Sequence, residues 1–136
     1  MSANVLIVED EFLIAMQLED IVTSGGHTVV GIVCDHASLG GIGEPPQVAL
    51  VDLNLRDGPS GLAIAMDLAR RHGTRILYVT ANPSQIVQPA PTAVGVVQKP
   101  FSPRTILAAI AIAIGNDNAR AACSAETEIN LFPRAI

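Results

Sequence analysis

The sequence predicts an α/β fold, a doubly wound five-stranded parallel sheet with helices on both faces. Two observations predict it. Short runs of branched apolar residues alternate along the chain with segments of helical periodicity, and these runs are continuously apolar rather than alternately apolar and polar. Continuously apolar strands are buried on both faces, which is typical of parallel sheets covered by helices. We expect the strands at residues 5–8, 28–33, 48–51, 75–79 and 94–97.

Three segments predict well-formed helices, because each combines apolar residues at helical spacing with a glycine near its end. The third follows Ser102, a residue type that caps helices, and has Pro103 at its first position. These helices are expected at residues 11–24, 60–72 and 102–115. Glycines and prolines leave room for only short helices within residues 35–47 and near residues 84–88. We therefore expect the second and fourth helices to be shortened.

Composition limits the domain organisation and the partners. The chain has 136 residues, 49% of them hydrophobic, which is enough for one compact domain. We place that domain at residues 1–115 and a C-terminal tail, with no effector domain, at residues 116–136. The net charge is -5, and the only basic cluster is Arg70-Arg71. This balance disfavours binding to nucleic acid or to an anionic membrane.

The sequence also predicts a cytoplasmic location. The first residues lack the basic start and the long apolar core of a signal peptide. The longest apolar run, residues 106–114, is too short to span a bilayer. Cys34 and Cys123 lie far apart in sequence, which predicts two free thiols in a reducing cytosol.

Polar and charged residues follow four of the five predicted strands. Glu9 and Asp10 follow the first strand, Asp52 the third and Thr80 the fourth. Lys99, the only lysine in the chain, follows the fifth. Right-handed crossovers place the carboxyl ends of parallel strands at one edge of the sheet, where doubly wound folds bind their ligands. We therefore expect three carboxylates, one hydroxyl and one ammonium to converge at this edge.

These residue types predict a site for magnesium and a phosphoryl group. Clustered carboxylates repel one another unless a cation joins them, and Mg²⁺ prefers carboxylate, water and phosphate oxygens. Asp10 and Asp52 fit as direct ligands and Glu9 as a ligand through a water; the alternative for Glu9 and Asp10 is to cap the following helix. Asp52, at the end of a rigid strand, can attack a phosphoryl group and form an acyl phosphate. Lys99 and the Thr80 hydroxyl would then stabilise the charge on the phosphoryl oxygens.

Four motifs, in this order along the chain, carry a resemblance to a known family. They are Val5-Leu6-Ile7-Val8-Glu9-Asp10-Glu11, Val51-Asp52-Leu53-Asn54, Tyr78-Val79-Thr80-Ala81 and Val97-Gln98-Lys99-Pro100-Phe101. Through these motifs, residues 4–115 resemble the receiver domain of two-component response regulators, the CheY-like fold, in its stand-alone form. The resemblance implies a flavodoxin-like strand order of 2-1-3-4-5 and a function in phosphorelay signalling.

The resemblance also implies a role for each site residue. Asp52 would accept the phosphoryl group of a histidine kinase or phosphotransfer protein, and Thr80 and Lys99 would read the phosphorylated state. The implied Mg²⁺ ligands are Glu9, Asp10, Asp52 and the main-chain carbonyl of Asn54. The resemblance further implies that the Lys99-Pro100 peptide bond is cis. The receiver would be a switch with self-catalysed phosphoryl uptake and loss, not an enzyme that turns over an external substrate.

One position departs from the family pattern. The family usually carries Tyr or Phe three residues before the lysine, where this chain has Val96. A valine has few rotamers and no ring to reposition, so we hypothesise that residues 82–92 carry the signal by ordering or shifting. Two alternatives to the switch remain: a receiver that binds partners without phosphorylation, and an aspartyl-nucleophile phosphatase. The phosphatase would want a proton-donating acid at the position of Asn54.

The last helix predicts an interface with another protein. Residues 106–114 include no polar side chain, so the helix cannot show a polar outer face and must be covered. We expect a homodimer or partner interface over Ile106, Ile110 and Ile114, with a tail that folds back over the helix as the alternative. The tail could be disordered, form a short helix from Ala119 or dock a partner, and the sequence does not choose among these.

Overall fold

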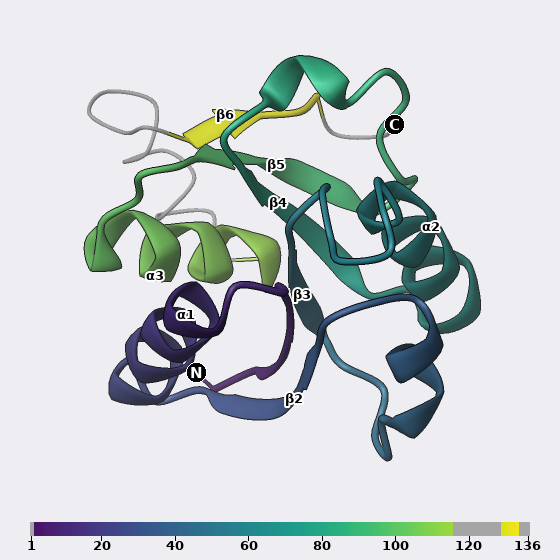
Figure 1. Ribbon diagram of the computed structural model, residues 1–136. Coiled ribbons are helices and arrows are strands. Elements are labelled where there is room, and N and C mark those ends of the chain that lie inside the picture. Colours follow the sequence, from purple (N-terminus) through teal and green to yellow (C-terminus); the bar gives the residue numbers. More distant parts are fainter. Residues whose placement is uncertain (1, 116–128, 134–136) are drawn as a thin grey trace.

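The computed structural model describes residues 2–115 and 129–133 (Figure 1). In this part of the chain, six strands form one sheet in the order β2-β1-β3-β4-β5-β6. The first five strands run parallel, and β6 pairs antiparallel with β5. The strands are β1 Asn4–Val8, β2 Thr28–Val33, β3 Val48–Val51, β4 Arg75–Thr80, β5 Ala93–Gln98 and β6 Ile129–Leu131.

Helices cover both faces of this sheet. The helices are α1 Phe12–Ser24, α2 Gly61–His72 and α3 Pro103–Ala113. Figure 1 shows α1 and α3 side by side on one face and α2 on the other. Successive side chains of β1 point to opposite faces. Val5 and Ile7 therefore pack in the core under α1 and α3, while Leu6 and Val8 pack in the core under α2.

The predicted α/β fold is confirmed, with the first five strands in the expected order. The elements expected to be shortened are single 3-10 segments, η1 Ala37–Gly41 and η2 Pro83–Gln85. Glycines make an α-helix entropically costly in η1, and prolines remove backbone donors around η2. The start of α3 also agrees with the sequence, because the Ser102 hydroxyl accepts a hydrogen bond from Thr105 N.

The sheet has one strand more than the five predicted. Residues 129–131, which the sequence analysis assigned to the tail, pair with β5 as β6. A three-residue strand is too short to show periodicity, and its partner β5 lies far away in sequence. No local pattern therefore predicts β6. The remainder of the predicted tail, with the helix considered from Ala119, lies outside the described residues.

The surroundings of α3 correct a second expectation. Ile106 and Ile110 are fully buried against the sheet, so the prediction that they form a dimer face is wrong. Helix α1 packs so closely beside α3 that a Cβ atom at Gly25 would lie 2.3 Å from Leu107 Cδ2. Ile129 of β6 joins the same core. Neighbouring elements of the same chain therefore cover the apolar residues of α3, and a dimer stays a prediction.

The structure also bears on three smaller expectations, which concern the cysteines, the peptide bond before Pro100 and a possible membrane span. Cys34 is a free thiol, and Cys123 lies outside the described residues. The Lys99-Pro100 peptide bond is cis, as the resemblance implied. Among the described residues, no helix has the length and apolar character needed to cross a membrane.

Candidate functional site

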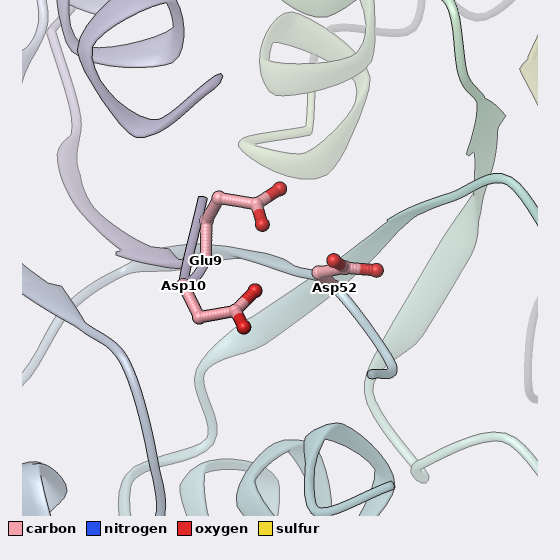
Figure 2. Close-up of side chains that lie close together, drawn as sticks. All are labelled: Glu9, Asp10 and Asp52. Carbon is pink, nitrogen blue, oxygen red and sulfur yellow. The ribbon is translucent and has the colours of Figure 1, made fainter. Parts of the chain in front are cut away.

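The carboxyl ends of β1 and β3 bring three acidic side chains together. Glu9 and Asp10 directly follow β1, and Asp52 directly follows β3. One carboxylate oxygen from each lies within 4.8 Å of the others, and Figure 2 shows the three side chains gathered at this edge. Backbone hydrogen bonds continue the parallel ladder to these positions, since Glu9 N donates to Val33 O and Asp52 N donates to Val8 O. The rigid sheet therefore fixes where the acids lie.

Lys99, directly after β5, supplies positive charge to this cluster. Its Nζ donates to Glu9 Oε1 at 2.7 Å and to Asp52 Oδ2 at 3.2 Å. The side chains of Lys99, Glu9 and Asp52 are 16%, 1% and 12% exposed. Because water reaches these groups poorly, the interactions are stronger than between charges on an open surface. One ammonium thus bridges two carboxylates that come from different strands.

The pKa values of Glu9 and Lys99 reflect this environment. Burial raises the pKa of the Glu9 carboxyl, the nearby charge of Asp52 raises it further, and Lys99 offsets part of the shift. For Lys99, burial alone would lower the pKa, but the hydrogen bond and charge of Glu9, together with Asp52, outweigh it and raise that pKa. Glu9 Oε2 also accepts a hydrogen bond from Glu11 N at 3.2 Å. Glu9 thus contacts the backbone at the start of α1, but the N-cap residue of α1 is Glu11 and no side chain caps the helix.

Thr80 lies at the same edge with its hydroxyl engaged by the backbone. The residue is fully buried, and Thr80 Oγ1 accepts a hydrogen bond from Asn82 N at 3.0 Å. Lys99 N donates to Thr80 O at 2.9 Å, which joins the ends of β4 and β5. A rotation of the hydroxyl toward Asp52 would therefore alter the bond that holds the start of residues 82–92.

Two loops beside the acids are tied by contacts that the sequence analysis did not predict. Asn54 Nδ2 donates to Gln85 Oε1 at 2.9 Å, which links the loop after β3 to η2. Arg56 in the same loop forms an ion pair with Asp35 at 2.8 Å. These partners are 31 and 21 residues apart, so no spacing along the chain could have indicated them. They hold the loop that follows Asp52 in place.

The donor set fits a hard divalent cation. Mg²⁺ takes one or two carboxylates together with waters and phosphate oxygens, and Glu9, Asp10 and Asp52 offer such oxygens close together. Lys99 bonds to two of these acids, and Asp10 is the most exposed of the three. A hydrated cation can therefore approach from the side of Asp10.

A family model matches most of the chain. The model described as response regulator receiver domain matches residues 5–111, a range that contains every site residue named above. The chain is also similar to the phyllosphere-induced regulator PhyR of Methylorubrum extorquens. The two are 33% identical over 118 residues, which cover 84% of this chain and 44% of that regulator. The chain thus spans less than half the length of this curated relative.

Solved structures show the same similarity in three dimensions. The REC domain of the Erythrobacter litoralis response regulator PhyR is 36% identical, with a TM-score of 0.75 over 83% of this chain and 90% of that one. A structure from Bartonella quintana, described as the anti-anti-sigma factor PhyR, is 32% identical. Its TM-score is 0.72, and the match covers 91% of this chain and 52% of that one.

Proposed function

Because the chain belongs to the response regulator receiver domain family, we propose that Asp52 accepts a phosphoryl group and that the chain then signals through protein contact. The donor is a histidine kinase or a phosphotransfer protein. The observation that carries this proposal is the bridge from Lys99 Nζ to the carboxylates of Asp52 and Glu9. A cation held against the acceptor favours the arrival of an anionic group, because it neutralises charge that develops during transfer.

The proposed transfer moves one phosphoryl group between two side chains. An Asp52 oxygen bonds to phosphorus while the bond from phosphorus to the donor's imidazole nitrogen breaks, and the electron pair of that bond returns to the nitrogen. The product is an acyl phosphate on Asp52. Lys99 then pairs with a phosphoryl oxygen, and the Thr80 hydroxyl donates to another. These two residues would report the phosphorylated state to the rest of the domain.

The acidic edge would hold Mg²⁺ during this step. The proposed ligands are Glu9, Asp10, Asp52 and the main-chain carbonyl of Asn54. When bound, the ion supplies charge neutralisation at the phosphoryl oxygens. The carboxylates would hold the ion in place, Asp10 and Asp52 directly and Glu9 through a water.

The proposed output is a protein contact in the cytoplasm. A relative of known structure is described as an anti-anti-sigma factor, so we propose that the partner is a protein regulator of a sigma factor. The net charge of -5 supports a protein rather than a nucleic acid or a membrane as the partner. In this role the chain is a regulator that turns over no external substrate.

Labelling with acetyl phosphate tests the proposal. Wild type, Asp52→Asn and Asp57→Asn are incubated with acetyl phosphate and Mg²⁺, and the acyl phosphate is quantified by phosphate-affinity electrophoresis. We expect a stable label on wild type and Asp57→Asn, no label on Asp52→Asn, and loss of labelling when EDTA removes the ion. Asp57 is a matched control because it is an exposed acid in the same loop.

The same experiment separates the alternatives. Continuous release of inorganic phosphate without an accumulating label would support the aspartyl-nucleophile phosphatase. The absence of any label, with a folded protein, would support a receiver that binds partners without phosphorylation. Either result contradicts the proposed phosphoacceptor switch.

A further inference from the structure

The outer edge of β5 is occupied by the chain's own C-terminal strand. Strand β6 pairs antiparallel with β5 through the partners Val97 and Ile129, Val96 and Asn130, and Gly95 and Leu131. One step further, Phe132 N donates to Val94 O at 2.9 Å. Figure 1 shows β6 as the last strand of the sheet, beside β5. An exposed strand edge offers unpaired backbone groups to any other strand. Here the backbone of β6 pairs with these groups of β5.

The apolar side chains of residues 129–132 contact the cores on both faces of the sheet. Ile129 is 7% exposed and packs in the core under α1 and α3. Phe132 contacts the opposite core, where its ring meets the Tyr78 ring edge-on at a centroid distance of 6.4 Å. Asn130, between them, is exposed. The edge thus recognises a sequence of the order apolar, polar, apolar, aromatic.

Gly95 leaves the space that this strand needs. A Cβ atom at Gly95 would lie 2.6 Å from Asn130 O, a backbone atom that cannot swing aside as a side chain could. The absence of a side chain at this one position of β5 therefore permits the close approach of a second strand. By contrast, a Cβ atom at Gly43 would have nothing within 4 Å.

The attachment of β6 is small enough to be exchanged. In the described part of this segment, the three residues of β6 and the amide of Phe132 pair with β5, and the segment is joined to α3 through residues 114–128 of the same chain. A segment tethered in this way competes at an effective concentration of about 1 mM. A partner strand held near the edge by other contacts can match that concentration, whereas a free peptide at micromolar concentration cannot.

We propose that the outer edge of β5 is a docking site for an extended strand of a partner protein, and that residues 129–132 are its built-in competitor. The partner strand would carry the same apolar, polar, apolar, aromatic order, because this is the pattern that the edge already accommodates. Backbone pairing gives such a complex its affinity, and the two pockets of Ile129 and Phe132 give it specificity. The docking site lies along the side of β5 that faces away from β4, and occupation of this site does not depend on phosphorylation of Asp52.

A peptide-binding experiment on the full chain tests this proposal. The probe is a fluorescein-labelled peptide with the sequence of residues 127–136, used without any phosphodonor, so that failure leaves the proposed phosphorylation untouched. The double variant Ile129→Asp/Phe132→Ser weakens the internal strand but keeps the edge. We expect it to bind the probe at least tenfold more tightly than wild type does. A probe that carries Phe132→Ser should bind the double variant at least tenfold more weakly.

Two further variants show whether the probe occupies the edge. Adding Gly95→Ala to the double variant should abolish binding, whereas adding Gly43→Ala should leave it unchanged, and circular dichroism checks that each variant is folded. Equal binding with and without Gly95→Ala, or no binding to any folded variant, overturns the proposal. Sedimentation of the double variant as a dimer that ignores the probe also overturns it, because a second copy would then be the occupant.

Discussion

The ammonium of Lys99 lies 2.7 Å from Glu9 Oε1, a carboxylate 90 residues earlier in the chain. The same ammonium is 3.2 Å from Asp52 Oδ2. The lysine therefore bridges the ends of three strands, because Glu9 follows β1, Asp52 follows β3 and Lys99 itself follows β5. Without a phosphoryl group, this bridge offsets the repulsion between the two carboxylates.

Replacement of Lys99 should therefore destabilise the domain. In Lys99→Met, Glu9 and Asp52 lose their shared counter-charge while Glu9 stays buried. We expect the free energy of unfolding to fall by about 2–3 kcal/mol at neutral pH without Mg²⁺, somewhat less than for a fully buried pair. Urea denaturation measures this change in the free energy of unfolding. The matched control is Arg56→Met, which breaks an ion pair whose arginine side chain is 63% exposed, and there we expect little change. Similar losses in both variants would contradict the bridging role of Lys99.

Magnesium should stabilise the protein through the three acids. A ligand that binds only the folded state at ten times its dissociation constant adds about 1.4 kcal/mol to the free energy of unfolding. Asp10→Asn should remove this gain, while the stability without Mg²⁺ stays equal or rises because one negative charge leaves the cluster. Thermal unfolding with and without MgCl₂ checks both results. Glu11→Gln is the control, since Glu11 is exposed and adjacent to Asp10, and this variant should keep the full stabilisation by Mg²⁺. Undiminished stabilisation by Mg²⁺ in Asp10→Asn would exclude Asp10 as a ligand.

The sequence predicted those parts of the fold and site that leave a local pattern. Strands β1, β3 and β4 are buried at nearly every position, and the strands read in the sequence as continuous apolar runs. The acids of the site follow two of these runs. The topology of parallel strands then brings these positions to one edge. The sequence alone therefore assigns Glu9, Asp52 and Lys99 to one site.

The features that local sequence could not predict depend on distant contacts. Strand β6 exists because Gly95 leaves room for it, and nothing near Ile129 indicates that vacancy. The same is true of the pair Asn54 and Gln85, which belong to separate loops. The last helix was expected to be covered by a partner or by the tail, whereas Leu107 of this helix lies against Gly25, which is distant in sequence. In each case the partner, and not the segment itself, determines the structure.

Residues 82–92 should respond to phosphorylation. Asn82 N donates to Thr80 Oγ1, and Gln85 pairs with Asn54 beside the acids. When the Thr80 hydroxyl turns toward a phosphoryl oxygen, the bond from Asn82 N changes. We expect the amide signals of Asn82 and Gln85 to shift in ¹H-¹⁵N NMR spectra on addition of beryllium fluoride with Mg²⁺. The shifts should be much smaller in Thr80→Ala and in η1 of wild type; unchanged signals in residues 82–92 would contradict the hypothesis that this segment carries the signal.

Alkaline pH should unfold the domain through Tyr78. This residue is the only tyrosine, is fully buried and accepts a hydrogen bond from Ala90 N at its hydroxyl oxygen. Burial raises the pKa of Tyr78 above its usual 10.0, and the Ala90 N–H offsets part of that shift. The folded state therefore holds this proton more tightly than the unfolded state, so its contribution to stability is full below pH 10 and is lost as pH rises through the folded pKa. Because the chain has no tryptophan, the ultraviolet absorption of tyrosinate follows the titration directly. The titration midpoint of Tyr78 should lie at a higher pH in the folded protein than in the urea-unfolded protein. Equal midpoints would contradict the prediction.

Leu13 should contribute to docking of the protein phosphodonor. Phe12 and Leu13 are 72% and 80% exposed at the start of α1, next to Asp10. Large apolar side chains exposed beside a reactive edge are typical of protein contacts, where truncation commonly costs more than about 1 kcal/mol, or fivefold in rate or affinity. We expect Leu13→Asp to slow phosphotransfer from a histidine phosphotransfer donor by at least about fivefold, while labelling by acetyl phosphate stays at the wild-type rate. Val87→Asp is the matched control, because Val87 is 91% exposed in the segment after β4 and lies outside α1. An equal loss in both variants would show that exposed apolar area in general, rather than the start of α1, binds the donor.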